Sequence, residues 1–275
     1  MKHYMMLLFA AVWPGIAAAG LLVTDLVGKA ETEGKKVIAV LAELADGTQL
    51  ALDGGARMVA VDLVSGREFV LRGPGRYRVD KDGPSAVQGV AVESAALPIK
   101  NLASIRIAPA GVAQAALVMR GIRKTSGLVL ESPVRTAVLT TTPKLRWLPV
   151  EGATGYRVVI SDDRGAQLFE AMAAEPEFTL PAPAGLAHGK RYKWRVEALG
   201  QQGSFADAAA EFSVLSTETA ERLAQLKPEA GAPYARRILY ATLLQEAGVR
   251  DEAKALWKSL AEERPGNELI TELAK

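Results

Sequence analysis

The sequence contains no cysteine and only two histidines, His3 and His188, among its 275 residues. The absence of cysteine excludes disulfide frameworks, thiolate zinc sites and cysteine nucleophiles. Two histidines also exclude any site that needs three imidazoles. The chain also has almost no excess of charge of one sign, since 33 basic and 31 acidic residues leave a net charge of +2. The chain therefore has no electrostatic signature of a nucleic-acid-binding protein.

What is present is the composition of a globular protein. Hydrophobic residues make up 49% of the chain and charged residues 23%, which excludes wholesale disorder. At roughly 100–200 residues per domain, a chain of 275 residues is expected to form two or three domains.

The N-terminus has the pattern of an export signal. After Lys2 and His3, no charged residue occurs before Asp25. Within this stretch an apolar run is followed by a Pro-Gly break and three alanines, which predicts a secretory signal peptide over residues 1–19. As an alternative, the 20 uncharged residues of Met5–Thr24 are about enough to form a membrane anchor. The protein is expected in the periplasm, anchored in the inner membrane if this segment is retained.

Residues 36–92 alternate between apolar and polar positions and are punctuated by glycine. The run Val37–Leu41 is predicted as a strand, and Asp46-Gly47 as the turn of a tight hairpin. Short strands separated by such turns are typical of an antiparallel β-sandwich or roll.

Two consecutive motifs in this region combine spaced leucines with glycine turns. They are Leu44-x-Asp46-Gly47-Thr48-x-Leu50-x-Leu52-x-x-Gly55-Ala56-x-Met58 and Leu63-x-Ser65-Gly66-Arg67-x-x-x-Leu71-x-Gly73-Pro74-Gly75. The pattern resembles the periplasmic β domain of FecR-like proteins, and we assign residues 20–108 to such a β roll. The resemblance implies association with the cell envelope and, as in some members, signalling to a sigma factor.

Residues 109–133 are predicted as a linker and residues 134–216 as a second β domain. Its motifs are Pro143-x-Leu145-x-Trp147-x-Pro149, Gly155-Tyr156-x-Val158-x-Ile160 and Tyr192-x-Trp194-x-Val196. The alternating aromatic and aliphatic positions would meet from two opposed sheets. The pattern resembles a fibronectin type III β-sandwich of the form found in exported bacterial proteins, with Tyr192 in a tyrosine corner.

Residues 217–275 change to helical periodicity, and three helices are predicted over 218–226, 233–247 and 251–263. Small, aromatic and turn residues follow the spacing Ala241, Gly248, Ala253, Trp257 and Pro265. This spacing resembles one tetratricopeptide repeat. A single repeat cannot bury its faces alone, so the tail is expected to pack on the sandwich, on its flanking helices or on a partner.

The sequence offers few candidates for a functional site. Arg72, Arg76 and Arg78 surround a Gly-Pro-Gly turn, where they would meet an anion such as a glycan carboxylate or a lipid phosphate, or simply occupy the solvent face of a strand. Tyr234 and Trp257 are candidate partner-binding residues of the helices. His188 is interpreted as an exposed turn residue, and no catalytic, cofactor-binding or metal-binding residue is predicted.

These features favour a mostly β protein, α+β overall, with a short C-terminal helical tail. The predicted function is a non-enzymatic, exported cell-envelope module that binds or scaffolds through its sandwich loops and helical tail. The expected partner is an envelope protein or peptide, or a glycan, and a membrane only if the N-terminal segment is retained. Two alternatives are a FecR-like envelope regulator anchored in the inner membrane and a glycan hydrolase with two carboxylates about 5–9.5 Å apart.

Overall fold

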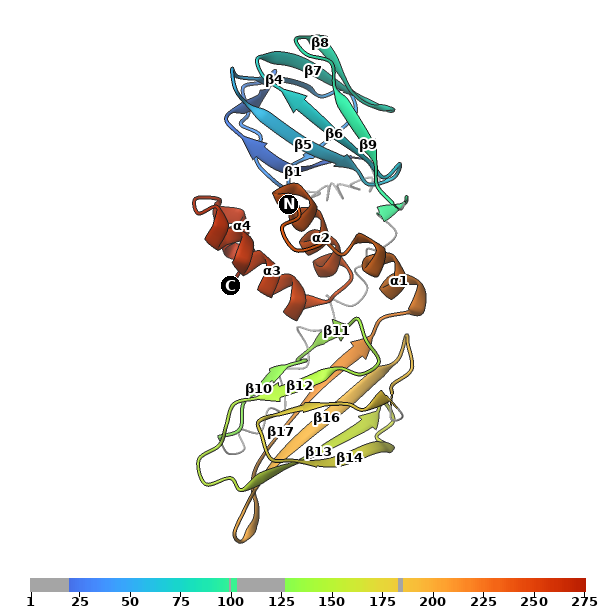
Figure 1. The fold of residues 1–275 in the computed structure, drawn as a ribbon, viewed down its shortest axis with the longest axis vertical. Helices are drawn as coiled ribbons and strands as arrows, with labels where there is room; N and C mark the ends of the chain where they lie inside the picture. Colours follow the sequence, from blue (N-terminus) through green and yellow to red (C-terminus); the bar gives the residue numbers. More distant parts are fainter. Residues whose placement is uncertain (1–19, 99, 103–126, 183–184) are drawn as a thin grey trace, which may run out of the picture.

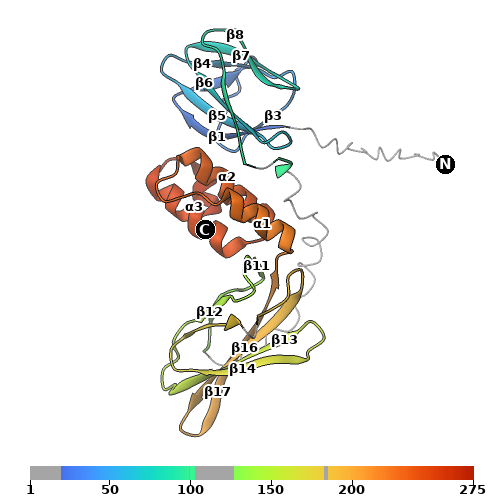
Figure 2. The ribbon, with the colours of Figure 1, turned by 45° about the vertical axis from the view of Figure 1, so that its right-hand side comes forward.

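The computed structural model describes residues 20–98, 100–102, 127–182 and 185–275. The predicted signal peptide (1–19) and the larger part of the predicted linker (109–126) lie outside these residues. Two β-structured parts stand at opposite ends of an elongated molecule, with helices between them (Figure 1, Figure 2). We call the two β-structured parts the β unit (20–102) and the sandwich (127–216), and the helices between them the helical unit (217–275). The structure confirms a mostly β chain with several antiparallel sheets and a short C-terminal helical region.

The β unit consists of two antiparallel sheets. In spatial order, the first sheet contains β3 (Glu43–Leu44), β1 (Leu21–Val27), β5 (Arg57–Asp62), β6 (Arg67–Arg72) and β9 (Glu93–Ala96). The second contains β2 (Ala30–Thr32), β4 (Gln49–Leu52), β7 (Gly75–Asp80) and β8 (Gly83–Gln88). The sheets share a core that includes Met58, Leu71 and Tyr77. The resemblance to FecR-like proteins stays a prediction.

The strand β1 was not predicted, because its residues end the uncharged N-terminal stretch. The first five residues of β1 are buried, and Leu22 and Val23 belong to different cores. A strand buried on both faces shows a continuous apolar run rather than alternation. Residues 21–24 of the possible anchor therefore belong to a folded sheet.

The predicted strand Val37–Leu41 is wrong. Its burial does alternate, with Ile38 buried and Val37 63% exposed, but the segment passes from one sheet to the other. The N–H of Ile38 donates to Ala30 O in the second sheet, whereas the N–H of Leu41 donates to Val23 O in the first. A chain that changes sheets after three residues has no partner strand for a regular ladder.

The turn at Asp46-Gly47 exists, but it does not close a hairpin. The strand before it, β3, pairs with β1, and the strand after it, β4, pairs with β2 and β7. Gly47 has a positive φ of 83°, which suits a residue without a side chain. The turn therefore joins the two sheets.

The sandwich also contains two sheets. The smaller sheet contains β10 (Leu130–Ser132), β12 (Lys144–Trp147) and β15 (Glu177–Thr179). The larger contains β11 (Thr136–Val138), β17 (Gly203–Val214), β16 (Arg191–Gly200), β13 (Gly155–Asp162) and β14 (Gln167–Ala173). This arrangement confirms a fibronectin type III-like sandwich. The strand β10 lies inside the predicted linker, so the sandwich begins before residue 134.

Aromatic residues fill the sandwich core as their alternation predicts. Trp147, Tyr156 and Trp194 are buried, and the Trp147 ring meets the Tyr156 ring edge-on at 5.2 Å between centroids. The indole N–H of Trp194 donates to Pro133 O at 2.8 Å, which satisfies the polar atom of a buried side chain. The hydroxyl of Tyr192 accepts from the N–H of Ala187 at 2.9 Å, so the tyrosine corner is present.

The helical unit contains four helices. They are α1 (Thr217–Leu226), α2 (Tyr234–Glu246), α3 (Arg250–Glu263) and α4 (Glu268–Leu273), the last of which was not predicted. Ala241 and Ala253 are almost fully buried, and Gly248 turns the chain between α2 and α3 with a φ of 78°. The resemblance to a tetratricopeptide repeat stays a prediction. Among the described residues, no helix is both long and apolar enough to cross a membrane.

The helical unit is last in the chain but central in space. One continuous core joins its buried face to Leu22, Val61 and Leu63 of the β unit and to Ala137 and Leu215 of the sandwich. Burying a leucine or valine contributes about 1.5–3 kcal/mol, against about 0–1 kcal/mol for an exposed ion pair. Apolar contacts therefore connect the three parts. Of the three arrangements expected for the helices, packing on the sandwich and packing on the flanking helices α1 and α4 are both observed, and packing on the β unit is added to them.

Candidate binding surfaces

The three arginines near the Gly-Pro-Gly turn do not form one cluster. Arg72 ends β6 in the first sheet, whereas Arg76 and Arg78 lie on β7 in the second. Arg72 pairs with Glu93 at 3.1 Å and Arg78 with Asp80 at 3.2 Å. Arg76 makes no ion pair with the described residues. The turn therefore offers one unpaired guanidinium to an anion instead of three, and anion binding here stays a prediction.

The glycines of this turn serve the fold. A Cβ on Gly73 would lie 1.8 Å from Asp53 O, and one on Gly75 would lie 2.8 Å from the Tyr77 ring. The Tyr77 hydroxyl donates to Arg72 O at 2.5 Å and so holds the turn against the sheet. The two glycines are thus explained by close packing, of Gly73 against the Asp53 backbone and of Gly75 against Tyr77.

The two helical candidates, Tyr234 and Trp257, are core residues, which corrects their assignment to a partner surface. Trp257 is 1% exposed, and its indole N–H donates to Oε1 of Gln245 at 2.8 Å. Tyr234 is 6% exposed, and burial raises the pKa of its phenol. The guanidinium of Arg264 lies 3.9 Å from the centre of the Tyr234 ring. Aromatic residues at helical spacing mark the buried face of these helices, so neither side chain is presented to a partner.

Arg264 also reaches a buried carboxylate of the β unit. Its Nη1 lies 2.5 Å from Oδ1 of Asp25, and Nη1 of Arg57 lies 3.3 Å from the other oxygen of the same carboxylate. The Asp25 side chain is 5% exposed and sits on β1. A buried carboxylate needs partners of opposite charge, and one of these two comes from the end of α3. Asp25 therefore ties the β unit to the helical unit.

A second set of polar contacts strengthens the same interface. Arg236 of α2 pairs with Glu68 of β6 at 3.0 Å. Arg222 of α1 donates to the backbone oxygens of Lys100 and Asn101 at 2.8 and 2.7 Å. All three helices α1, α2 and α3 thus contribute a cation to the contact with the β unit.

On its other side, the helical unit is bonded to the sandwich through Thr136 of β11. The N–H of Arg250 donates to the Thr136 hydroxyl at 2.9 Å, and the N–H of Ala137 donates to Gly248 O at 2.8 Å. The Ser132 hydroxyl donates to Asp251 at 2.5 Å. Backbone groups of the α2–α3 turn therefore continue the bonding of the sandwich edge.

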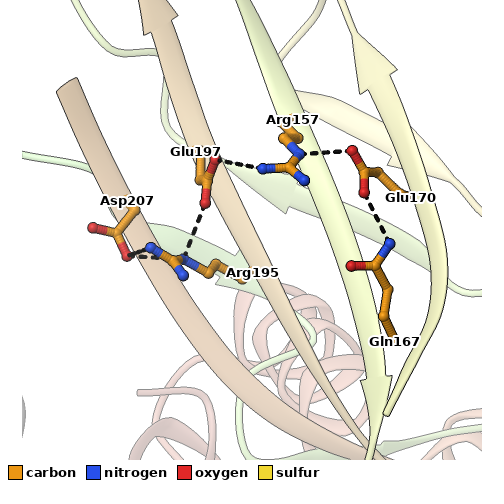
Figure 3. A network of polar contacts seen from close by, with 6 residues as sticks. All are labelled: Arg157, Gln167, Glu170, Arg195, Glu197 and Asp207. Atoms are coloured by element: carbon orange, nitrogen blue, oxygen red, sulfur yellow. Dashed lines mark hydrogen bonds and ion pairs between the residues drawn. The ribbon is translucent and has the colours of Figure 1, made fainter. Parts of the chain in front are cut away.

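The outer face of the larger sandwich sheet carries a network of paired charges (Figure 3). Arg157 bonds to Glu170 at 2.7 Å and to Glu197 at 3.4 Å. Arg195 bonds to Glu197 at 3.5 Å and to Asp207 at 3.0 Å. The hydrogen bond from Arg157 lowers the pKa of Glu170, with a further contribution from Gln167. Each charge drawn in this network already has a partner on the sheet.

A cavity of 270 Å³ at the edge of the β unit is lined by three carboxylates, those of Asp46, Asp62 and Asp80. Asp62 accepts from the N–H and the hydroxyl of Ser65, and Asp80 pairs with Arg78. Among the described residues, no group of three acidic or histidine side chains is arranged to hold a metal. These bonds give Asp62 and Asp80 structural roles in local turns.

His188 is exposed in the turn before β16, as predicted. Its Nδ1 lies 2.8 Å from Leu215 O, so the ring supports the junction between the sandwich and α1. This contact gives the imidazole a structural role at the junction.

No family model and no curated protein matches the chain. Among solved structures, a fibronectin type III-like protein from Clostridium thermocellum is 22% identical over 33% of this chain and 90% of its own, with a TM-score of 0.26. A fibronectin type III domain of human collagen alpha-1(XX) is 23% identical over 34% of this chain and 85% of its own, with a TM-score of 0.26. A two-domain segment of chicken tenascin is 12% identical over 73% and 87%, with a TM-score of 0.25. At these scores, the assignment of the sandwich rests on its own strand order.

Proposed function

We propose that this chain is an exported, non-enzymatic protein of the cell envelope that acts as a rigid binding or scaffolding module. The observation that carries the proposal is the position of the helical unit, whose core is shared with both β-structured parts. A module of this kind holds its two loop-bearing ends at a constant separation. Rigid placement of exposed loops is a common basis of binding by β-sandwiches.

The buried polar groups support a structural role for the interior. Among the residues that the structure describes, the buried polar side chains are Thr24, Asp25 and Thr136. Thr24 donates to Val59 O at 3.4 Å, Asp25 pairs with two arginines, and Thr136 bonds to the α2–α3 turn. Two of the three lie at contacts between parts of the molecule. The polar interior is thus arranged to hold the parts together.

Spin-label distances test the rigidity directly. Because the chain has no cysteine, Val87→Cys on β8 and Leu168→Cys on β14 introduce two unique labelling sites, 64% and 52% exposed. We expect a single narrow distance distribution between the labels in a pulsed electron-electron resonance measurement. The pair Leu168→Cys with Val129→Cys, both within the sandwich, supplies the width of a rigid reference. A distribution several times broader than this reference would contradict the proposal.

The export part of the proposal predicts a defined mature N-terminus. The strand β1 begins at Leu21, so cleavage before Gly20 would leave the folded sheet complete. We expect N-terminal sequencing of the protein from fractionated cells to begin at Gly20, with the protein in the periplasmic fraction. Recovery of the intact N-terminus in the membrane fraction would instead favour the anchored alternative.

A further inference from the structure

The far end of the sandwich carries a depression between two loops. It lies between the β12–β13 connection and the turn that joins β16 to β17, and it has a volume of 520 Å³. This turn is at the end of the molecule opposite the β unit (Figure 1, Figure 2). Its surface is therefore clear of the contacts that join the three parts.

One wall of the depression is an exposed aromatic ring. Phe205 is 45% exposed, and every other aromatic side chain in the described part of the chain is buried or half-buried. The ring rests on the backbone of the turn, since a Cβ on Gly200 would lie only 3.1 Å from it. An apolar ring that is held in place but left uncovered is suited to contact with a ligand.

The other lining groups are polar and have free bonding capacity. Glu151, Gln201, Gln202 and Ser204 line the same depression. None of their side chains forms an ion pair or a hydrogen bond with the described residues. On the outer face of the same sandwich, by contrast, the charges are bonded to one another (Figure 3). Unpaired amide, carboxylate and hydroxyl groups therefore gather around Phe205.

This combination matches the chemistry of a sugar. A pyranose ring presents C–H bonds on its face, which pack on an aromatic ring, and hydroxyls at its edge, which bond to amides and carboxylates. The site includes one acidic side chain, Glu151, and no basic one, so an anionic polysaccharide would be repelled. The depression has one aromatic side chain and lacks the apolar walls that an anchor residue of a peptide would fill.

We propose that this depression binds a neutral oligosaccharide, with Phe205 as the stacking platform and Glu151, Gln201, Gln202 and Ser204 as hydrogen-bonding groups. The inference rests on the proposed binding function and gives it a ligand class. The turn Gly200–Phe205 supplies most of the lining residues, and the loop at Glu151 supplies the rest.

The experiment is a titration of the full chain followed by backbone nuclear magnetic resonance. The probes are the β-1,4-linked tetrasaccharides of N-acetylglucosamine and of glucose, with a galacturonate tetrasaccharide as the anionic control. We expect saturable shifts confined to the two loops with at least one neutral probe and none with galacturonate. The absence of shifts with both neutral probes, or equal binding of galacturonate, would overturn the inference.

Two variants distinguish a loss of the Phe205 ring from a loss of the fold. Phe205→Ala is expected to weaken binding at least about tenfold, and Leu168→Ala, which removes a similarly exposed side chain from β14, to leave it unchanged. Melting temperatures of both variants equal to that of the unchanged chain would show that the fold is intact. Full binding by Phe205→Ala would refute the role of the ring. A narrow distribution of spin-label distances without sugar binding would contradict this inference alone. Sugar binding with a broad distribution would contradict the rigid scaffold and support the sugar site.

Discussion

Trp257→Ala is expected to destabilise the protein by about 3–5 kcal/mol, the cost of removing a large aromatic side chain from a packed core. Trp257 is 1% exposed and lies in the core that the helical unit shares with both β-structured parts. A cavity at this position therefore weakens the contacts that hold the two ends of the molecule. Chemical denaturation followed by tryptophan fluorescence and circular dichroism measures the loss.

Two further substitutions make the result specific. Trp257→Phe keeps most of the apolar volume but loses the hydrogen bond to Gln245, so it should cost less than the alanine variant. Lys258→Ala changes the exposed neighbour on α3 and should alter stability by no more than about 0.5 kcal/mol. If Trp257→Ala kept full stability and lost only the binding of a partner, the sequence-based assignment of Trp257 to a partner surface would be right after all.

Asp25→Ala is expected to cost about 3 kcal/mol, at the lower end of the range for removing one member of a buried ion pair. The lower end applies because Arg57 and Arg264, each 40% exposed, retain access to water after the change. The substitution also removes a contact between β1 and the end of α3. We therefore expect a broader spin-label distance distribution between β8 and β14 in addition to the lower stability.

Glu93→Ala is the matched control for this prediction. It breaks the Arg72–Glu93 pair, whose two side chains are 48% and 60% exposed, and exposed pairs contribute about 0–1 kcal/mol. The same denaturation and distance measurements should show little change for this variant. Equal effects of Asp25→Ala and Glu93→Ala would mean that burial of the carboxylate does not matter and that Asp25 does not tie the units together.

The proposed sugar site shows what sequence patterns miss. Phe205 lies two positions after the Gln-Gln-Gly turn, and the register shift of β16 and β17 between Ala198 and Leu199 leaves it without a partner in the ladder. An aromatic residue shortly after a polar, glycine-containing turn is the signal that would have identified it. The patterns instead favoured arginines, because charge is visible in a sequence while the pairing of that charge is not.

Local periodicity alone determined the sandwich core and the first three helices. Trp147 and Trp194 alternate with polar neighbours, and Ala241 and Trp257 recur at helical spacing, so each pattern marks a buried face without reference to distant residues. Local periodicity does not predict which other surface of the molecule covers such a face.

The tertiary structure decided which surfaces meet. It placed the last part of the chain in the middle of the molecule, and it paired Asp25 with Arg264 across 239 positions of sequence. It also gave β1 two buried faces, one toward the second sheet and one toward the helices. The physical reason is that burial of one face is a property of a segment, whereas the partner of that face is chosen by packing between segments that lie far apart in the chain.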